Sequence, residues 1–128
     1  MIDHVNAFAL VVKDVRKSAE FYRDKLGFIL KDVSDNFAYL KFSEDKGPGL
    51  ALVSKSGHEK DLANGVEKHD SNHAFYFASF LEDADKEFEE LRSKGVKFIV
   101  SPVNRPDGQR YAFFEDPEGN LWEISHFS

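Results

Sequence analysis

Two hydrophobic periodicities follow each other at the start of the chain. Residues 4–12, HVNAFALVV, form an apolar run that is typical of a strand. Apolar side chains then recur at helical spacing between Asp14, which can cap a helix at its N-terminus, and Gly27, which can end it. The pattern predicts a strand followed by an amphipathic helix.

The same succession occurs a second time later in the chain. Residues 73–81, HAFYFASFL, read as a strand, and a helical pattern follows from Asp83 to Gly95. A histidine precedes each capping aspartate by ten residues, at His4 and His73. This coincidence indicates an internal repeat.

Three further strand candidates follow each predicted helix. They are FILKDV, NFAYLKF and LALVS in the first half and VKFIV, RYAFFE and NLWEISHF in the second. In the last hairpin, Pro117 and Gly119 fit a type I turn that ends in a left-handed glycine. The sequence therefore predicts an α+β fold of two βαβββ modules, with eight strands and two helices.

The two modules divide a single domain of residues 1–128. Module 1 covers about residues 1–54, a polar linker or loop about residues 55–72, and module 2 about residues 73–128. One βαβββ unit leaves a sheet face bare, so we expect two curled mixed sheets around a concave cavity, with the helices on the outer face. The modules can pair within one chain or across a homodimer.

Composition narrows the possible functions. The chain has no cysteine, so a metal site would need histidine and carboxylate ligands. The net charge of −6, with 17 basic residues scattered among 23 acidic ones, argues against nucleic acid. No run of about 18 apolar residues exists for a membrane span, the N-terminal segment meets a charge too early for a signal peptide, and we expect a cytoplasmic location. Thirteen phenylalanines suit an aromatic cavity or a buried subunit interface.

Two segments carry a family resemblance. Residues 5–28, VNAFALVVKDVRKSAEFYRDKLGF, and residues 105–124, RPDGQRYAFFEDPEGNLWEI, together with the doubled βαβββ plan, resemble the vicinal-oxygen-chelate superfamily of glyoxalases, bleomycin-resistance proteins and extradiol dioxygenases. The resemblance covers nearly the whole chain and is weakest over residues 55–72. It implies the fold, but no single activity.

The resemblance also implies where a metal would bind. Metal-using members take one ligand from the first and one from the last strand of each module, positions that fall here on Ala7, Ala51, Tyr76 and Glu123. Only Glu123 matches a liganding residue, because alanine has no lone pair and the phenol of Tyr76 is a poor ligand at neutral pH. No metal cofactor is therefore expected.

A second strand register would change this conclusion. If the first strand of each module contained a bulge, His4 and His73 could join Glu123 in a two-histidine, one-carboxylate set. The chain would then be a divalent-metal lyase or dioxygenase using Ni, Zn, Mn or Fe. The remaining histidines have no ligand-spaced partners and are predicted on the surface: His58, His69 and His126.

The favoured register predicts an apolar cavity for a small organic ligand. Strand alternation places Ala7, Ala9, Val11, Tyr76, Ala78 and Phe80 on the concave face, and their neighbours Phe8, Leu10, Val12, Phe77 and Leu81 under the helices. Glu123 is the expected polar anchor and, in a metal-free catalyst, the general base. The predicted ligand-binding residues are Ala7, Ala51, Tyr76, Phe80, Arg105, Arg110 and Glu123.

Overall fold

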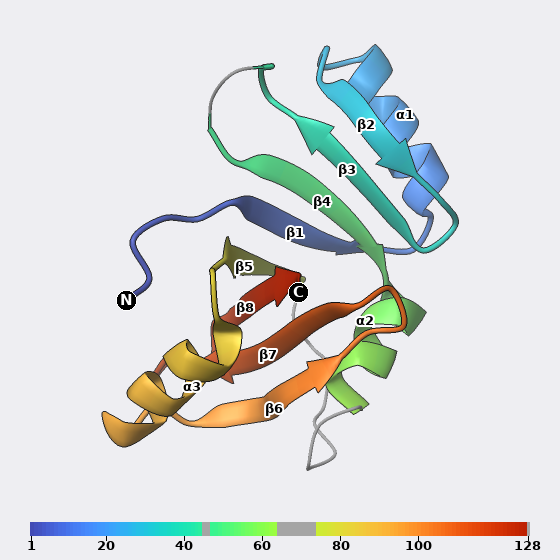
Figure 1. The fold of residues 1–128 in the computed structure, drawn as a ribbon. Coiled ribbons are helices and arrows are strands. Elements are labelled where there is room, and N and C mark those ends of the chain that lie inside the picture. The colour runs from blue at the N-terminus through green and yellow to red at the C-terminus, as the bar shows by residue number, and fades with distance from the viewer. Residues whose placement is uncertain (45–46, 64–73, 128) are drawn as a thin grey trace.

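Eight strands form one mixed sheet in the computed structural model, which describes residues 1–44, 47–63 and 74–127 (Figure 1). The strands are β1 (Ala7–Val12), β2 (Ile29–Val33), β3 (Phe37–Lys41), β4 (Gly49–Ser54), β5 (Phe75–Phe80), β6 (Phe98–Asn104), β7 (Gln109–Glu115) and β8 (Leu121–Phe127). The helices are α1 (Val15–Asp24), α2 (Lys55–Ala63) and α3 (Ala84–Ser93). The predicted α+β fold and the doubled βαβββ plan are confirmed.

The two modules join edge to edge within one chain. The strand order is β2-β3-β4-β1-β5-β8-β7-β6, so β1 and β5 meet at the centre as an antiparallel pair. Inside the modules, β1 runs parallel to β4, and β5 runs parallel to β8. The sheet ends at β2 and β6 without closing, and its curvature leaves a concave face between the modules.

Helices α1 and α3 begin at the predicted aspartates. The side chain of Asp14 accepts a hydrogen bond from the backbone N–H of Lys17 at 3.0 Å, and Asp83 accepts one from Lys86 at 3.1 Å. α1 contacts β2, β3 and β4, and α3 contacts β6, β7 and β8, so each helix covers the outer face of its own module. Residues Phe8, Leu10 and Val12 pack against the α1 core, as strand alternation predicts.

Helix α2 lies where the sequence predicts a loop. Its first turn is capped by Ser54, whose side-chain oxygen accepts the backbone N–H of Gly57 at 3.0 Å and donates to Asn36 at 2.8 Å. Only two of its nine residues, His58 and Leu62, are buried. A helix with so narrow an apolar face, interrupted by a glycine in its first turn, has no clear helical periodicity in the sequence.

The turn between β7 and β8 has the predicted form. The backbone N–H of Gly119 donates to the carbonyl of Asp116 at 3.0 Å, and Gly119 has a φ of 86°. The Asp116 carboxylate also accepts the backbone N–H groups of Glu118 and Asn120, both at 2.9 Å. This turn fixes the register of the hairpin, so that Glu123 lies opposite Phe113 and points into the concave face.

Among the described residues, no helix is long and apolar enough to cross a membrane.

Candidate functional site

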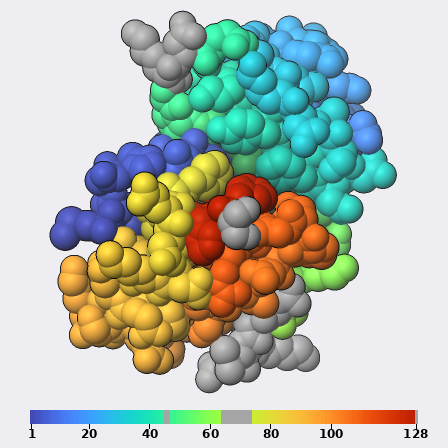
Figure 2. Space-filling view, in the orientation of Figure 1, coloured from blue at the N-terminus to red at the C-terminus, as the bar shows by residue number. Residues whose placement is uncertain are grey.

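A cavity of about 590 Å³ lies on the concave face, between the two modules. Figure 2 shows the molecule with the first module above, in teal to blue, and the second below, in yellow to red. The cavity is lined by Ala7, Ala9, Asp32, Asn36, Phe37, Tyr39, Ala51, Val53, Gly57, Asp61, Tyr76, Ala78, Phe80, Arg105, Asp107, Gln109, Glu123 and Phe127. Both modules and helix α2 therefore contribute to one site.

The four positions that the resemblance implies for metal ligands, Ala7, Ala51, Tyr76 and Glu123, all line this cavity. The strand register explains their proximity, because Ala9 pairs with both Ala51 and Tyr76, and Ala78 pairs with Glu123. Ala7 lies two residues before Ala9 on the same face of β1. The four side chains thus supply one carboxylate, one phenol and two methyl groups, which do not fit a divalent metal ion.

A guanidinium group neutralises the carboxylate. Nη2 of Arg105 donates to Oε2 of Glu123 at 2.6 Å and to Oδ2 of Asp61 at 2.8 Å. Its Nη1 donates to the side-chain oxygen of Gln109 at 2.7 Å, and the guanidinium carbon lies 3.9 Å from the ring centroid of Tyr111. Because Glu123 is only 5% exposed, this ion pair is largely shielded from water. The positive charge beside Glu123 comes from the protein itself.

Burial sets the protonation behaviour of the site. Desolvation raises the pKa of Glu123 above its ordinary value, although the charge and hydrogen bond of Arg105 offset part of the effect. Burial alone would lower the pKa of Arg105, but the neighbouring carboxylates of Glu123 and Asp61 raise it above its usual range. Burial, followed by the charge of Glu123, raises the pKa of Tyr76 well above 10.0. Tyr76 is therefore a neutral hydrogen-bonding group at physiological pH.

We expect the substitution Glu123→Gln to change the pH dependence of stability. A carboxyl group whose pKa is raised by folding stabilises the protein below its unfolded value, here 4.5, and that contribution is lost as the pH rises through the raised pKa. As the pH rises above 4.5, the free energy of unfolding of the parent protein should therefore fall relative to that of Glu123→Gln, by at most about 1.4 kcal/mol per pH unit.

Urea denaturation at a series of pH values measures this difference. The exposed residue Glu20 provides the matched control, and Glu20→Gln should give a curve parallel to that of the parent protein. If the difference in the free energy of unfolding between the parent protein and Glu123→Gln stayed constant with pH, or changed in the opposite direction, the pKa of Glu123 would not be raised by folding.

Tyr76 lies on a buried histidine that was predicted on the surface. His58 is 1% exposed, and its ring stacks on Tyr76 with centroids 5.2 Å apart and an interplanar angle of 13°. The ring also meets Phe113 edge to face at 6.1 Å. The surface prediction for His58 was wrong because it assumed a loop, whereas α2 directs this side chain inward against Tyr76 and Phe113.

The other predicted ligand-binding residues separate into two groups. Phe80 and Arg105 line the cavity, and Phe80 remains 42% exposed at its mouth. Arg110 does not line the cavity. It lies beside α3, where its Nε donates to Asp85 at 2.7 Å, while the next residue, Tyr111, faces the cavity side. Arg110 is a neighbour of α3 because β7 alternates its side chains between the two faces of the sheet.

Of the two histidines in the alternative metal set, the structure describes only His4. His4 precedes β1, is exposed and contacts Asp3, and it does not line the cavity. His73 and His69 lie outside the residues that the structure describes.

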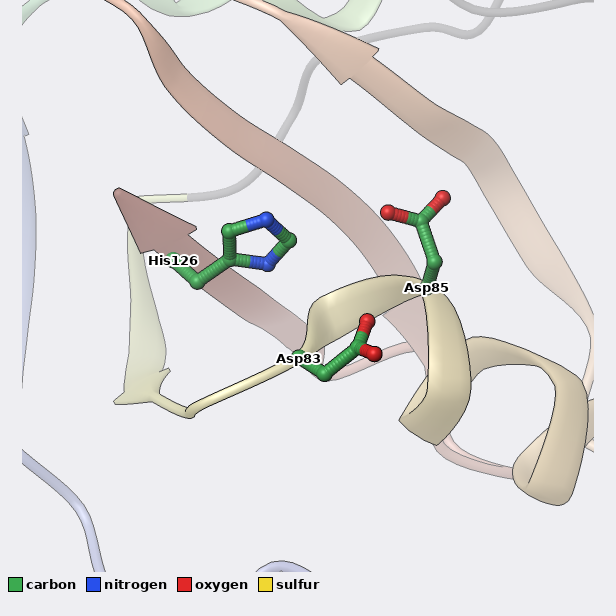
Figure 3. A group of neighbouring side chains, drawn as sticks. All are labelled: Asp83, Asp85 and His126. Carbon is green, nitrogen blue, oxygen red and sulfur yellow. The ribbon is translucent and has the colours of Figure 1, made fainter. Parts of the chain in front are cut away.

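A separate group of possible ligands lies on the outer face, at the start of α3. Figure 3 shows Asp83 and Asp85 from this segment close to His126 from β8, with ligand atoms within 4.8 Å of one another. Each side chain already has a structural partner, since Asp83 caps α3, Asp85 pairs with Arg110, and Nδ1 of His126 accepts the backbone N–H of Ala84 at 2.7 Å. These contacts explain the cluster without a metal ion.

Sequence reasoning missed several polar residues of the site, among them two side chains that hold Arg105. Asp61 and Gln109 hold Arg105, and the backbone carbonyl of Asp61 also accepts the hydroxyl of Tyr111 at 2.9 Å. Asp61 lies in the helix that was predicted as a linker, and nothing in its local sequence marks it as a partner of Arg105. Gln109 begins β7, where strand alternation could have placed it on the same face as Tyr111.

Comparison with known proteins gives a family match over residues 1–124, to the Glyoxalase/Bleomycin resistance protein/Dioxygenase superfamily. YraH of Bacillus subtilis, strain 168, is 33% identical over 122 residues, covering 90% of this chain and 91% of its own. The metallothiol transferase FosB of Staphylococcus saprophyticus is 28% identical over 128 residues, covering 97% of this chain and 77% of its own.

A solved structure has the same fold. Methylmalonyl-CoA epimerase from Mycobacterium tuberculosis superposes with a TM-score of 0.73 at 20% identity, covering 99% of this chain and 89% of the epimerase. At this level of identity the likeness shows the fold and not the reaction.

Proposed function

Because the chain belongs to the Glyoxalase/Bleomycin resistance protein/Dioxygenase superfamily, we propose that it binds a small organic ligand, without a metal ion, in the cavity between its modules. The observation that carries the proposal is the replacement of the metal-binding set. Ala7 and Ala51 offer no donor atom, and Arg105 supplies the positive charge next to Glu123. The remaining family position, Tyr76, offers a neutral hydroxyl.

The cavity has the size and lining of a small-molecule site. A volume of about 590 Å³ lies within the usual range for such sites, which are largely apolar with a few polar groups. Aromatic rings from both modules, among them Tyr39, Tyr76 and Phe80, provide flat surfaces for stacking. In this proposal Tyr76 and Glu123 orient the ligand, and Glu123 is the group that a metal-free proton transfer would use.

A divalent-metal enzyme is the second candidate, and the match to a metallothiol transferase favours it. It would use Glu123 with His73, and Ni, Zn, Mn or Fe as the ion. The ion would have to displace Arg105 from Glu123, and these two side chains are 2.6 Å apart.

The first proposal also includes a homodimer. Light scattering measures the oligomeric state.

A thermal-shift screen with aromatic small molecules tests the proposed function. We expect at least one compound class to raise the melting temperature, since a ligand at 100 times its dissociation constant adds about 2.7 kcal/mol of stability. Ala51→Trp should abolish the shift by filling the cavity, whereas Lys25→Trp on the exposed end of α1 should preserve it. Shifts that survive Ala51→Trp would place binding elsewhere and contradict the proposal.

A further inference from the structure

We infer that the ligand of this cavity is an organic cation, a flat or aromatic molecule that carries a protonated amine or a quaternary ammonium group. The inference rests on the proposed function and adds the chemical class of the ligand. It follows from the charges and the aromatic rings that share the opening of the cavity.

Negative charge prevails among the described residues that line the cavity. Four carboxylates face it, from Asp32, Asp61, Asp107 and Glu123, and Arg105 is the one basic residue among them. The formal charge of the lining is therefore −3, and it is still −2 if Glu123 is protonated. An anionic ligand would be repelled by this lining, and a cation would be attracted to it.

The single guanidinium is not available to bind an anion. Arg105 is shared between Asp61 and Glu123 at 2.8 and 2.6 Å, and its Nη1 bonds to Gln109 at 2.7 Å. Its side chain is 16% exposed. A ligand carboxylate or phosphate would have to replace a buried partner that already matches the guanidinium, so Arg105 serves the protein's own carboxylates.

The remaining acidic groups lie where an incoming ligand meets them. Asp32 on β2 and Asp107 in the loop between β6 and β7 are exposed cavity residues. Among the hydrogen bonds and ion pairs of the described residues, Asp107 accepts only the backbone N–H of Gln109 at 2.9 Å, which leaves its charge without a cationic partner.

Aromatic rings occupy the same opening. Phe37, Phe80 and Phe127 line the cavity and are 40%, 42% and 66% exposed, so a ligand can reach their rings. The face of an aromatic ring attracts a cation, and desolvation strengthens the interaction. Exposed rings next to carboxylates suit a ligand that is both apolar and positively charged. A neutral hydrocarbon would contact only the rings, and an organic anion would be repelled by the carboxylates.

A matched set of three probes tests this inference. The probes are 1-naphthylmethylamine, 1-naphthalenemethanol and 1-naphthoate, which share one aromatic body and differ in charge. Binding to the full chain is measured by calorimetric titration at low and at physiological salt. We expect the amine to bind about tenfold more tightly than the alcohol, with the anion weakest, and the preference for the amine should shrink as salt rises.

Charge-neutralising variants locate the effect. The double variant Asp32→Asn and Asp107→Asn should remove most of the preference for the amine while leaving the affinity for the alcohol unchanged. Asp24→Asn, at an exposed aspartate of α1 outside the cavity, is the matched control and should change neither.

The outcomes separate the inference from the proposed function. If the alcohol or the anion binds as tightly as the amine, and Ala51→Trp abolishes this binding, the cation inference is overturned and the binding function stands. If none of the three probes binds, or if Ala51→Trp changes nothing, the proposed function fails and the inference falls with it.

Discussion

Replacing Arg105 with methionine should destabilise the protein by about 3–5 kcal/mol at neutral pH, which is the typical effect of breaking a buried ion pair. The substitution leaves Glu123, whose side chain is 6% exposed, and Asp61, at 25%, without their shared positive partner. It also removes the stacking of the guanidinium on Tyr111. Urea denaturation measures the loss, and it should shrink at acidic pH, where the protonated form of Glu123 needs no counter-charge.

A double-mutant cycle distinguishes this charge effect from lost packing. Adding Glu123→Gln to Arg105→Met should restore more than half of the lost stability, because the buried negative charge is removed as well. Arg110→Met is the matched control, since Arg110 also pairs with an aspartate but is 33% exposed, and it should cost less than about 1 kcal/mol. If both arginine variants lost the same stability, the ion pair at Glu123 would not be the special feature of this site.

Replacing Phe113 with alanine should also cost about 3–5 kcal/mol, through a cavity rather than a charge. Phe113 is fully buried on the concave side of β7, and its ring meets Tyr76 at 5.3 Å, Tyr111 at 5.6 Å and His58 at 6.1 Å. Phe113 is therefore a packing centre, which connects β7 to His58 on α2 and to the cavity residue Tyr76 on β5. The free energy of unfolding in urea measures the cost.

Two controls accompany this prediction. Phe113→Leu should recover most of the stability, because it keeps much of the volume and the apolar character of the side chain. Phe21→Ala, at a 52% exposed position on α1, should cost less than about 1 kcal/mol. A small effect of Phe113→Ala would mean that the neighbouring rings repack easily into the space, and Phe113 would not be the packing centre of this part of the core.

The sequence was most informative where local chemistry and periodicity act together. Asp14 and Asp83 begin their helices because their side chains satisfy N–H groups of the first turn, and Gly119 ends the β7–β8 turn because it adopts a positive φ. Strand alternation also accounts for the face on which Ala7, Ala51, Tyr76 and Glu123 lie, and all four line the cavity. These features depend on near neighbours or on a period of two, and both can be read along the chain.

The remaining features depend on contacts across long sequence separations. Arg105 was predicted as a ligand-binding residue, but its partners Asp61 and Glu123 lie 44 and 18 residues away along the chain. Helix α2 was missed because only two of its side chains, His58 and Leu62, are buried, which is too few to give a helical periodicity in the sequence. No periodic pattern in the sequence encodes such contacts, and the charge balance of the site follows from them.

A site that binds its ligand without a metal ion should show no specific affinity for divalent metals, and metal binding can be measured on the protein itself. The metal content of the isolated protein should be substoichiometric. Titration with Ni²⁺, Zn²⁺, Mn²⁺ or Fe²⁺ should leave the melting temperature unchanged, both in the parent protein and in Glu123→Ala. Any shift that His126→Ala abolishes belongs to the cluster on the outer face. Stoichiometric metal, or a shift that Glu123→Ala abolishes and His126→Ala preserves, would contradict the account.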